Sequence, residues 1–371
     1  MLRAFKYRLF PNKQQQRLLE RQLDECRWLY NHLLAARRDA WEQRQETLRY
    51  YDQATRLPAL KAERPALAEV NAQALQNVAV RIDLAFKAFF RRVKAGEKPG
   101  YPRFRGKGRY DSLTYPQVPS GCKLEVDARR LRVHGVGQVK LILHRPLEGT
   151  PKTATISRSS TGKWYVCFSC ECAEPSPLPD TGQQVGIDVG LKTFATLSTG
   201  QEIANPRFFR AEEKALAKVQ RAHSKLAQGT PERAKHRHAV ARVHERIMWR
   251  RGDFAHQHSR RLVNAFELIA VEDLSVNRMT HHHCLAKSIQ DAAWSQFTAL
   301  IAYKAAWAGR QYVAVNPAYT RQDCSQCGHR KTDLTLADRT YTCSCCGVAV
   351  DRDVNASLNI LRLGQQSRAS A

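Results

Sequence analysis

Apolar residues first alternate with polar ones and then change to a helical spacing. Phe5, Tyr7 and Leu9 share one face of a segment that stops at Pro11, and this period of two is typical of a half-buried strand. After Lys13 the apolar residues recur every three or four positions, as on one stripe of a helix. The first such stripe consists of Leu19, Leu23, Cys26, Tyr30 and Leu33, and a second one of Leu75, Val78, Ile82, Phe86, Phe89 and Val93. We therefore predict a strand followed by a helical bundle over residues 12–109.

Short alternating segments return between residues 112 and 173. Their apolar pairs include Leu131/Val133 and Val139/Leu141, and glycines separate them. Short strands at this spacing are typical of a small barrel or sandwich. We expect the N-terminal strand to join this barrel, so that residues 1–11 and 110–175 form one β domain and the helical bundle is an insertion in it. A proline-rich stretch after residue 174 marks the next boundary.

Two apolar runs in the third region each lead to a carboxylate. The strand predicted at Val185–Ile187 precedes Asp188, and the one at Phe266–Val271 precedes Glu272 and Asp273. A carboxylate at the end of a buried strand is suited to hold a divalent cation. Glu272 comes first after its apolar run, so we take it, rather than Asp273, as the metal-facing group. Actin-like ATPases also begin with a strand, an Asp and glycines, which makes a phosphate-binding ATPase fold the alternative interpretation.

Composition and charge narrow the choice of partner. The chain has 371 residues, with 60 Lys and Arg against 34 Asp and Glu and a formal charge of +26. This length is sufficient for several domains, and the excess positive charge favours nucleic acid as partner, with an acidic membrane surface as the weaker alternative. No apolar run approaches membrane-spanning length, and the charged first residues do not form a signal peptide. We therefore expect an intracellular protein.

Two CxxC pairs give the strongest chemical signal. Cys324 and Cys327 form one pair, Cys343 and Cys346 the other, and a mostly polar stretch separates them. A two-residue gap lets both sulfurs of a pair face one tetrahedral ion, so we predict a zinc ribbon over residues 321–347 with one structural Zn²⁺. Cys345 lies inside the second pair and is an alternative ligand. Incidental buried thiols would not explain two matched pairs.

Two basic segments are candidate nucleic-acid contacts. The stretch Pro99–Tyr110 interleaves cations with aromatic side chains that can stack on bases, and a helix predicted from Glu212 to about Leu226 carries further cations on one side. The cations singled out are Arg103, Arg105, Lys107, Lys214, Lys218 and Arg221. An interdomain linker and an ordinary solvated helix face are the alternatives. Three adjacent histidines, His281–His283, cannot easily converge on one ion and are predicted to form a loop.

Asp188, Glu272 and a third carboxylate at the start of a late helix form an ordered set. Asp351 and Asp353 both precede Asn355, where that helix is predicted to begin. This order is that of a ribonuclease H-like nuclease, in which three carboxylates from separate elements hold two Mg²⁺ ions. We predict such an α/β nuclease domain over residues 180–320 and 348–365, followed by a tail at 366–371.

The chain resembles TnpB, a family of transposon-encoded RNA-guided nucleases that are similar to type V CRISPR effector nucleases. The resemblance covers residues 1–362 and rests on LYNHLL, ALQN, GYPRFR, GIDVGLKTFA, VEDL, AYTRQDCSQCG, CSCCG and DRDVNASLNI. It implies a multidomain α+β protein with a wedge-like β-barrel, an inserted helical recognition domain, an RNase H-like (RuvC-like) nuclease domain and a four-cysteine zinc ribbon. The family's third catalytic Asp stands just before x-Asn-Ala, so the resemblance assigns catalysis and Mg²⁺ binding to Asp188, Glu272 and Asp353. Ser357, where an Ala is more usual, and the extra Cys345 depart from the pattern.

In function, the resemblance implies an RNA-guided DNA endonuclease. A noncoding guide RNA from the transposon would pair with one strand of a double-stranded target, and the protein would read only a short adjacent motif, with Tyr50 and Gln76 as candidate contacts. Cleavage would be two-metal hydrolysis, with Mn²⁺ able to replace Mg²⁺. The alternatives are a nuclease-inactive RNA-guided regulator and an RNA-independent DNA transposase with an RNase H-like site. The expected location is the cytoplasm of a prokaryote, at the nucleoid.

Overall fold

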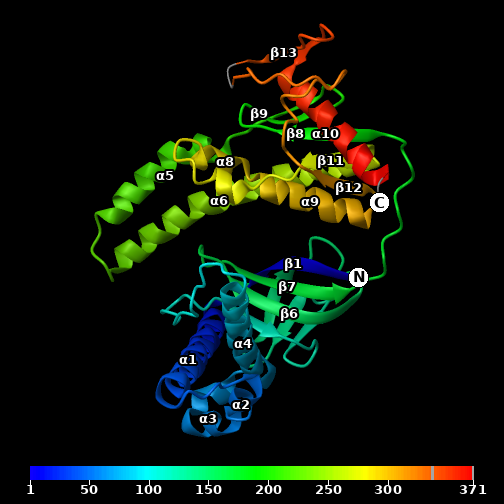
Figure 1. The fold of residues 1–371 in the computed structure, drawn as a ribbon. Helices are drawn as coiled ribbons and strands as arrows, with labels where there is room; N and C mark the ends of the chain where they lie inside the picture. Colours follow the sequence, from blue (N-terminus) through cyan, green and yellow to red (C-terminus); the bar gives the residue numbers. More distant parts are fainter. Residues whose placement is uncertain (336–337, 370–371) are drawn as a thin grey trace. The chain divides into compact units, whose positions relative to one another are not determined.

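The computed structural model describes residues 1–335 and 338–369, and the chain forms two compact units (Figure 1). The first extends from Met1 to Ala173 and the second begins at Glu174. Among the described residues, no helix combines the length and the apolar character needed to cross a bilayer.

The first unit contains a seven-stranded, barrel-like sheet. Its strands are β1 (Leu2–Phe10), β2 (Ser112–Tyr115), β3 (Cys122–Glu125), β4 (Arg130–Val133), β5 (Gly137–Ile142), β6 (Thr150–Arg158) and β7 (Trp164–Glu171). They follow the order β2-β6-β7-β1-β5-β4-β3, and all neighbours are antiparallel. The N-terminal strand β1 therefore lies inside the sheet, as its alternating pattern predicts.

Helices occupy the stretch between β1 and β2. They are α1 (Lys13–Arg44), α2 (Tyr50–Ala54), α3 (Leu57–Glu63), the 3₁₀ helix η1 (Pro65–Glu69) and α4 (Ala72–Lys94). Asn12 begins α1 with a capping box, because its side chain accepts the Gln15 amide while the Gln15 side chain accepts the Asn12 amide. The apolar stripe of α1 and the inward residues of β1 belong to one hydrophobic core. The stripe of α4 is fully buried in this core as far as Ile82; Phe86 packs against the core but stays partly exposed, as does Phe89, and Val93 is exposed.

The second unit contains a five-stranded sheet with the order β10-β9-β8-β11-β12. Its strands are β8 (Gln184–Val189), β9 (Thr193–Leu197), β10 (Glu202–Ala204), β11 (Leu268–Glu272) and β12 (Gln311–Val315). The three strands at β8, β11 and β12 pair in parallel, whereas β9 and β10 are antiparallel additions. The sequence pattern predicts the strands β8 and β11 but does not separate β9 and β10 from them.

Helices cover both faces of this sheet. They are α5 (Phe208–Ser224), α6 (Pro231–Ala265), α7 (Val276–Met279), α8 (Ala286–Ala292), α9 (Trp294–Trp307) and α10 (Arg352–Ala369). One face packs against α6 and α9, and the other against α10, which lies along β8 and β11 in Figure 1. Helix α9 begins at Trp294, directly after Ala293, whose left-handed backbone with φ 54° separates it from α8. His281–His283 lie in a turn between α7 and α8, as predicted.

Two glycines allow α10 to approach the sheet closely. A Cβ atom on Gly186 of β8 would lie 2.0 Å from the carbonyl oxygen of Ser357, and one on Gly364 of α10 would lie 2.6 Å from Cβ of Ala270. No larger residue fits at either position without moving the helix. The first turn of α10 is therefore held at a fixed position over the sheet.

Candidate active site and metal centre

Strand alternation directs two of the predicted carboxylates to the same face of the sheet. Ile187 of β8 pairs with Val271 of β11, and both belong to the core under α6 and α9. Since successive side chains of a strand point to opposite faces, Asp188 and Glu272 point toward α10. Both are buried, with 2% and 7% of their surface exposed.

The third predicted carboxylate lies in the first turn of α10. The Asp351 carboxylate accepts hydrogen bonds from the amides of Asp353 (2.8 Å) and Val354 (3.1 Å), so it caps the helix. Asp353 has no such capping role, and its charge acts on Asp188 together with that of Glu272. Of the two aspartates that the sequence leaves open, Asp351 caps the helix, whereas the carboxylate of Asp353 pairs with the guanidinium of Arg352 at 3.6 Å.

A cation already faces the buried carboxylates. The guanidinium of Arg321 lies 2.7 Å from Oδ1 of Asp188, and the hydroxyl of Thr320 donates to Glu272. Burial raises the pKa of Asp188 to about 7; Arg321 opposes this rise, while the negative charges of Glu272 and Asp353 add to it. A divalent cation would relieve the same repulsion, and carboxylate oxygens are the donors that Mg²⁺ prefers. The residues therefore fit such an ion, although among the described residues they do not converge as closely as the cysteines do.

Thr320 and Arg321 are the site residues that the sequence does not predict. They stand in AYTRQDCSQCG, directly before the first CxxC pair. Their proximity to that motif was the available signal, but neither periodicity nor spacing indicates that they contact carboxylates from distant strands.

Four cysteines form a compact sulfur cluster. The Sγ atoms of Cys324, Cys327, Cys343 and Cys346 all lie within 4.8 Å of one another. The distance is 3.6 Å for Cys324–Cys346 and for Cys327–Cys343, whereas tetrahedral bonds of about 2.3 Å would separate the sulfurs by about 3.8 Å. The cluster therefore fits one tetrahedral metal ion, and the exposed Cys345 lies outside it.

The turns that carry the cluster use glycine where the sequence predicts it. Gly328 and Gly347 have φ of 74° and 73°, and their amides donate to the carbonyls of Cys324 and Cys343. The amide of Cys346, and then that of Cys345, lower the pKa of the Cys343 thiol to about 6. The second knuckle connects β13 (Thr340–Thr342) and β14 (Ala349–Asp351), which form a small antiparallel pair.

Two buried asparagines join the cysteine-rich segment to α10. Asn355 accepts from the Ser325 amide (2.9 Å) and donates to the carbonyl of Asp323 (2.8 Å). Asn359, one turn further, donates to the carbonyls of Thr320 (2.9 Å) and Asp323 (2.6 Å). Both side chains are at most 1% exposed. The sequence does not predict this role for Asn359, and the spacing of four between the two asparagines was the available signal.

The predicted nucleic-acid contacts are mostly accessible. Arg103, Arg105 and Lys107 are exposed between α4 and β2, and Gln76 is exposed on α4, whereas Tyr50 is half-buried against the core. On α5 the exposed cations line a shallow groove of about 920 Å³, in which Glu213 is the acidic member. These cations are Arg210, Lys214, Lys218, Arg221 and Lys225. Their roles remain predictions.

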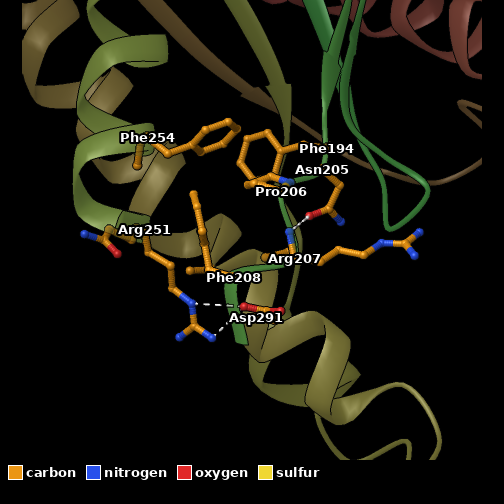
Figure 2. Close-up of a pocket in the computed structure, with 12 residues that line it drawn as sticks. Phe194, Asn205, Pro206, Arg207, Phe208, Arg251, Phe254 and Asp291 are labelled. Atoms are coloured by element: carbon orange, nitrogen blue, oxygen red, sulfur yellow. Dashed lines mark hydrogen bonds and ion pairs between the residues drawn. The ribbon is translucent and has the colours of Figure 1, made fainter. Parts of the chain in front are cut away.

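One buried carboxylate fastens α5 to its neighbours. Asp291, in α8, accepts hydrogen bonds from the amides of Phe209 (2.9 Å) and Arg210 (3.2 Å) at the start of α5 and from the guanidinium of Arg251 in α6 (2.8 Å). Figure 2 shows Arg251 reaching Asp291 below the ring pair Phe194–Phe254. The orientation of the basic helix α5 thus depends on a residue that the sequence pattern treats as an ordinary helix position.

The fold of this chain is similar to the folds of solved protein structures. The structure titled "Cryo-EM structure of the Cas12f1-sgRNA-target DNA complex" is similar to this chain with a TM-score of 0.61, covering 94% of this chain and 83% of that one at 16% identity. A family model described as Cas12f1-like, TNB domain, matches residues 294–360, which contain the cluster.

Sequence comparisons give the family. The OrfB_IS605 model, described as a probable transposase, matches residues 167–283, and a helix-turn-helix domain model matches residues 1–46. A putative RNA-guided DNA endonuclease of Streptomyces pristinaespiralis is 36% identical over 99% of this chain and 90% of its own length. The putative RNA-guided DNA endonuclease InsQ of Escherichia coli is 30% identical over 98% and 92%. The chain belongs to the TnpB family of these proteins.

Proposed function

We propose that this protein is an RNA-guided DNA endonuclease that cleaves double-stranded DNA beside a short motif. The observation that carries the proposal is the pair of buried carboxylates, Asp188 and Glu272, on adjacent parallel strands beneath the helix that bears Asp353. The names of the two relatives above support the same activity. In this proposal residues 180–320 and 348–365 form a RuvC-like nuclease domain.

The carboxylates would hold two Mg²⁺ ions, for which Mn²⁺ can substitute. When bound, the metal pair supplies an activated water and stabilises the leaving oxygen of the phosphodiester. The chain's own residues prepare the site. Strand alternation places Asp188 and Glu272 on one face of the sheet, where both are buried. The hydroxyl of Thr320 orients Glu272 by donating a hydrogen bond to it. Burial raises the pKa of Asp188, and a bound cation would act against this rise.

The sulfur cluster would hold one structural Zn²⁺. Structural zinc contributes directly to folding, because the four-sulfur site exists only in the folded chain, so that the free energy of metal binding stabilises that state. Asn355 and Asn359 connect the base of this zinc ribbon, residues 321–347, to the helix that carries Asp353. Zinc would therefore help to fix a catalytic carboxylate without taking part in the reaction.

The partners would be a noncoding guide RNA and a double-stranded target DNA. A formal charge of +26 favours binding to phosphates with release of counterions. The barrel, residues 1–11 and 110–175, would act as the wedge domain and residues 12–109 as the recognition domain that reads the motif. An enzyme with this substrate would work in the cytoplasm of a prokaryotic cell, at the nucleoid.

Strand-resolved cleavage by Asp353→Ala tests the proposal. We expect the variant to copurify with RNA and to bind target DNA with the wild-type salt dependence, yet to cut neither strand. When three carboxylates act as a unit, removing one costs nearly as much activity as removing all three. Asp253→Ala removes the same charge at an exposed position of α6 and should cleave normally.

Three outcomes would contradict parts of this proposal. Normal cutting of one strand by Asp353→Ala would require a second active site. Cleavage of bare duplex by RNA-free wild-type protein would favour the transposase. RNA-dependent DNA binding without any cleavage by wild-type protein would favour a nuclease-inactive regulator.

A further inference from the structure

An aromatic pocket opens on the helical part of the first unit. It has a volume of about 420 Å³ and is lined by α1, by the segment that follows it, by the second half of α4 and by Tyr101. Three lining aromatics expose about half of their surface: Trp41 (54%), Phe90 (58%) and Tyr101 (46%). Exposed apolar side chains that gather in this way usually mark a binding site.

The rings meet edge to face. Tyr101 lies across Phe86 with an interplanar angle of 89° and across Phe89 with 78°, while Phe89 and Phe90 are inclined at 70°. Edge-to-face contacts fix the rings and leave faces free for a further flat group. Such faces are suited to stacking against a nucleobase.

A buried arginine forms the base of the pocket and is held there by other side chains of the chain. The guanidinium of Arg37 lies over Phe86, 5.2 Å from the ring centroid, and is buried. It donates to Gln53 (2.7 Å) and pairs with Asp83 (3.4 Å). A ligand would therefore enter a preformed site, at a lower cost in conformational entropy.

Cations follow the lining residues Phe89 and Phe90 along the chain, and we call these cations the rim of the pocket. Five cations follow one another along the last turn of α4 and the segment after it, and none has a carboxylate partner within residues 1–335 and 338–369. They are Arg91, Arg92, Lys94, Lys98 and Arg103. Arg92 lies near the lining residue Tyr101, since a Cβ atom on the preceding Gly100 would lie 4.0 Å from its Nη1. Glu46, the acidic lining residue, is neutralised by Arg44 at 3.1 Å.

Apolar ring faces inside a cationic rim fit a ligand with flat apolar groups on an anionic chain. A second copy of this protein fits poorly, because two such rims would repel each other. We propose that the pocket binds an unpaired nucleobase of the guide RNA, stacked against Phe90 and Trp41, while the rim holds the adjoining phosphates. The inference rests on the proposed function. RNA is recognised mainly through unpaired bases in loops and at ends, whereas the target DNA arrives as a duplex.

Photocrosslinking tests the site in the native complex. The full chain is expressed in cells supplied with 4-thiouridine, purified with its RNA, irradiated and digested with trypsin. We expect RNA-derived mass on the peptide Ala88–Arg91, which contains Phe89 and Phe90. Crosslinks found only elsewhere would overturn the pocket and leave the proposed function intact. A preparation without RNA would contradict the proposed function itself.

A binding measurement separates stacking from charge. RNA-free full chain is titrated with a short uridine RNA and with an abasic RNA of equal length, at high salt to screen the phosphates. Phe90→Ala and Trp41→Ala should weaken uridine RNA about tenfold, as the loss of one base stack does, and leave abasic RNA unchanged. Leu84→Ala is the matched control, because Leu84 is also on α4 and 57% exposed but does not line the pocket.

The same measurements also show whether something other than an RNA base occupies the pocket. Equal losses for both RNAs, or none for either, would overturn the inference. Dissociation of a dimer by Phe90→Ala in light scattering would show that a second copy fills the pocket. A crosslink at Ala88–Arg91 to 4-thiothymidine in target DNA, and none to RNA, would assign it to DNA instead.

Discussion

Asp291→Ala should destabilise the second unit. The carboxylate is 4% exposed and receives two backbone amides from α5 as well as the guanidinium of Arg251, itself 24% exposed. Removing one partner of a buried ion pair costs about 3–5 kcal/mol, and loss of a helix cap alone costs about 1 kcal/mol. Because Arg251 can turn toward water, the lower end applies, and we expect a loss of roughly 3 kcal/mol.

Urea denaturation followed by circular dichroism measures this loss. Asp253→Ala is the control, since Asp253 lies on the same helix as Arg251, is exposed and accepts a hydrogen bond from Gln257 alone among the described residues. The free energy of unfolding of Asp253→Ala should stay within about 0.5 kcal/mol of the wild-type value. Asp291→Asn retains a hydrogen-bond acceptor without the charge, so its free energy of unfolding should lie between those of Asp291→Ala and Asp253→Ala.

Hydrogen exchange localises the effect. The amides of α5, Phe208–Ser224, should exchange faster in Asp291→Ala, because the start of this helix loses its partner. The reasoning is refuted if Asp291→Ala and Asp253→Ala have the same urea midpoint and the same protection of α5. In that case the carboxylate would not hold the helices together.

Three further predictions concern metals and pH. Cys324→Ser should lose the single zinc in elemental analysis and unfold at a lower temperature, whereas Cys345→Ser should keep the zinc and the wild-type thermal midpoint. Active protein that contains no zinc would contradict this prediction. Arg321→Gln should bind Mn²⁺ more tightly in calorimetry, because a cation that competes for the buried carboxylates is removed, and weaker binding would contradict the idea. Burial, and then the charge of Arg260, lower the pKa of Lys304 to about 8. Between pH 8 and the ordinary lysine pKa the unfolded chain therefore binds more protons than the folded one, so the free energy of unfolding should rise with pH in this range and stay flat below it. Lys304→Met should remove this rise, and an unchanged pH profile of the urea midpoint would refute the assignment.

The sequence predicts those features whose cause lies in local spacing. Alternation in β8 and β11 is sufficient to direct Asp188 and Glu272 to one face, and the CxxC spacing is sufficient to gather four sulfurs. The contact between Arg321 and Asp188 joins segments far apart in the chain, and no periodicity encodes it.

The pocket in the first unit illustrates a second limit of sequence patterns. Phe86 and Phe89 continue the apolar stripe of α4 and fit a core helix, but Ile82 is the last fully buried residue of the stripe, and Phe86 and Phe89 stay partly exposed. Hydrophobic spacing predicts that a face will be covered, but not whether the covering group belongs to the same chain. Asp291 shows the same limit for polar residues, since its partners come from other helices.

The position of α10 across β8 has a consequence for biosynthesis. Gly186 and Asp188 stand at the middle of the sequence, but the helix that packs on this strand, α10, is made much later, at residues 352–369. The proposed catalytic carboxylates can therefore meet only after almost the whole chain has been translated. A nascent or prematurely terminated chain would carry the basic surfaces of α1, α4 and α5 without an assembled active site, and would occupy nucleic acid without cutting it.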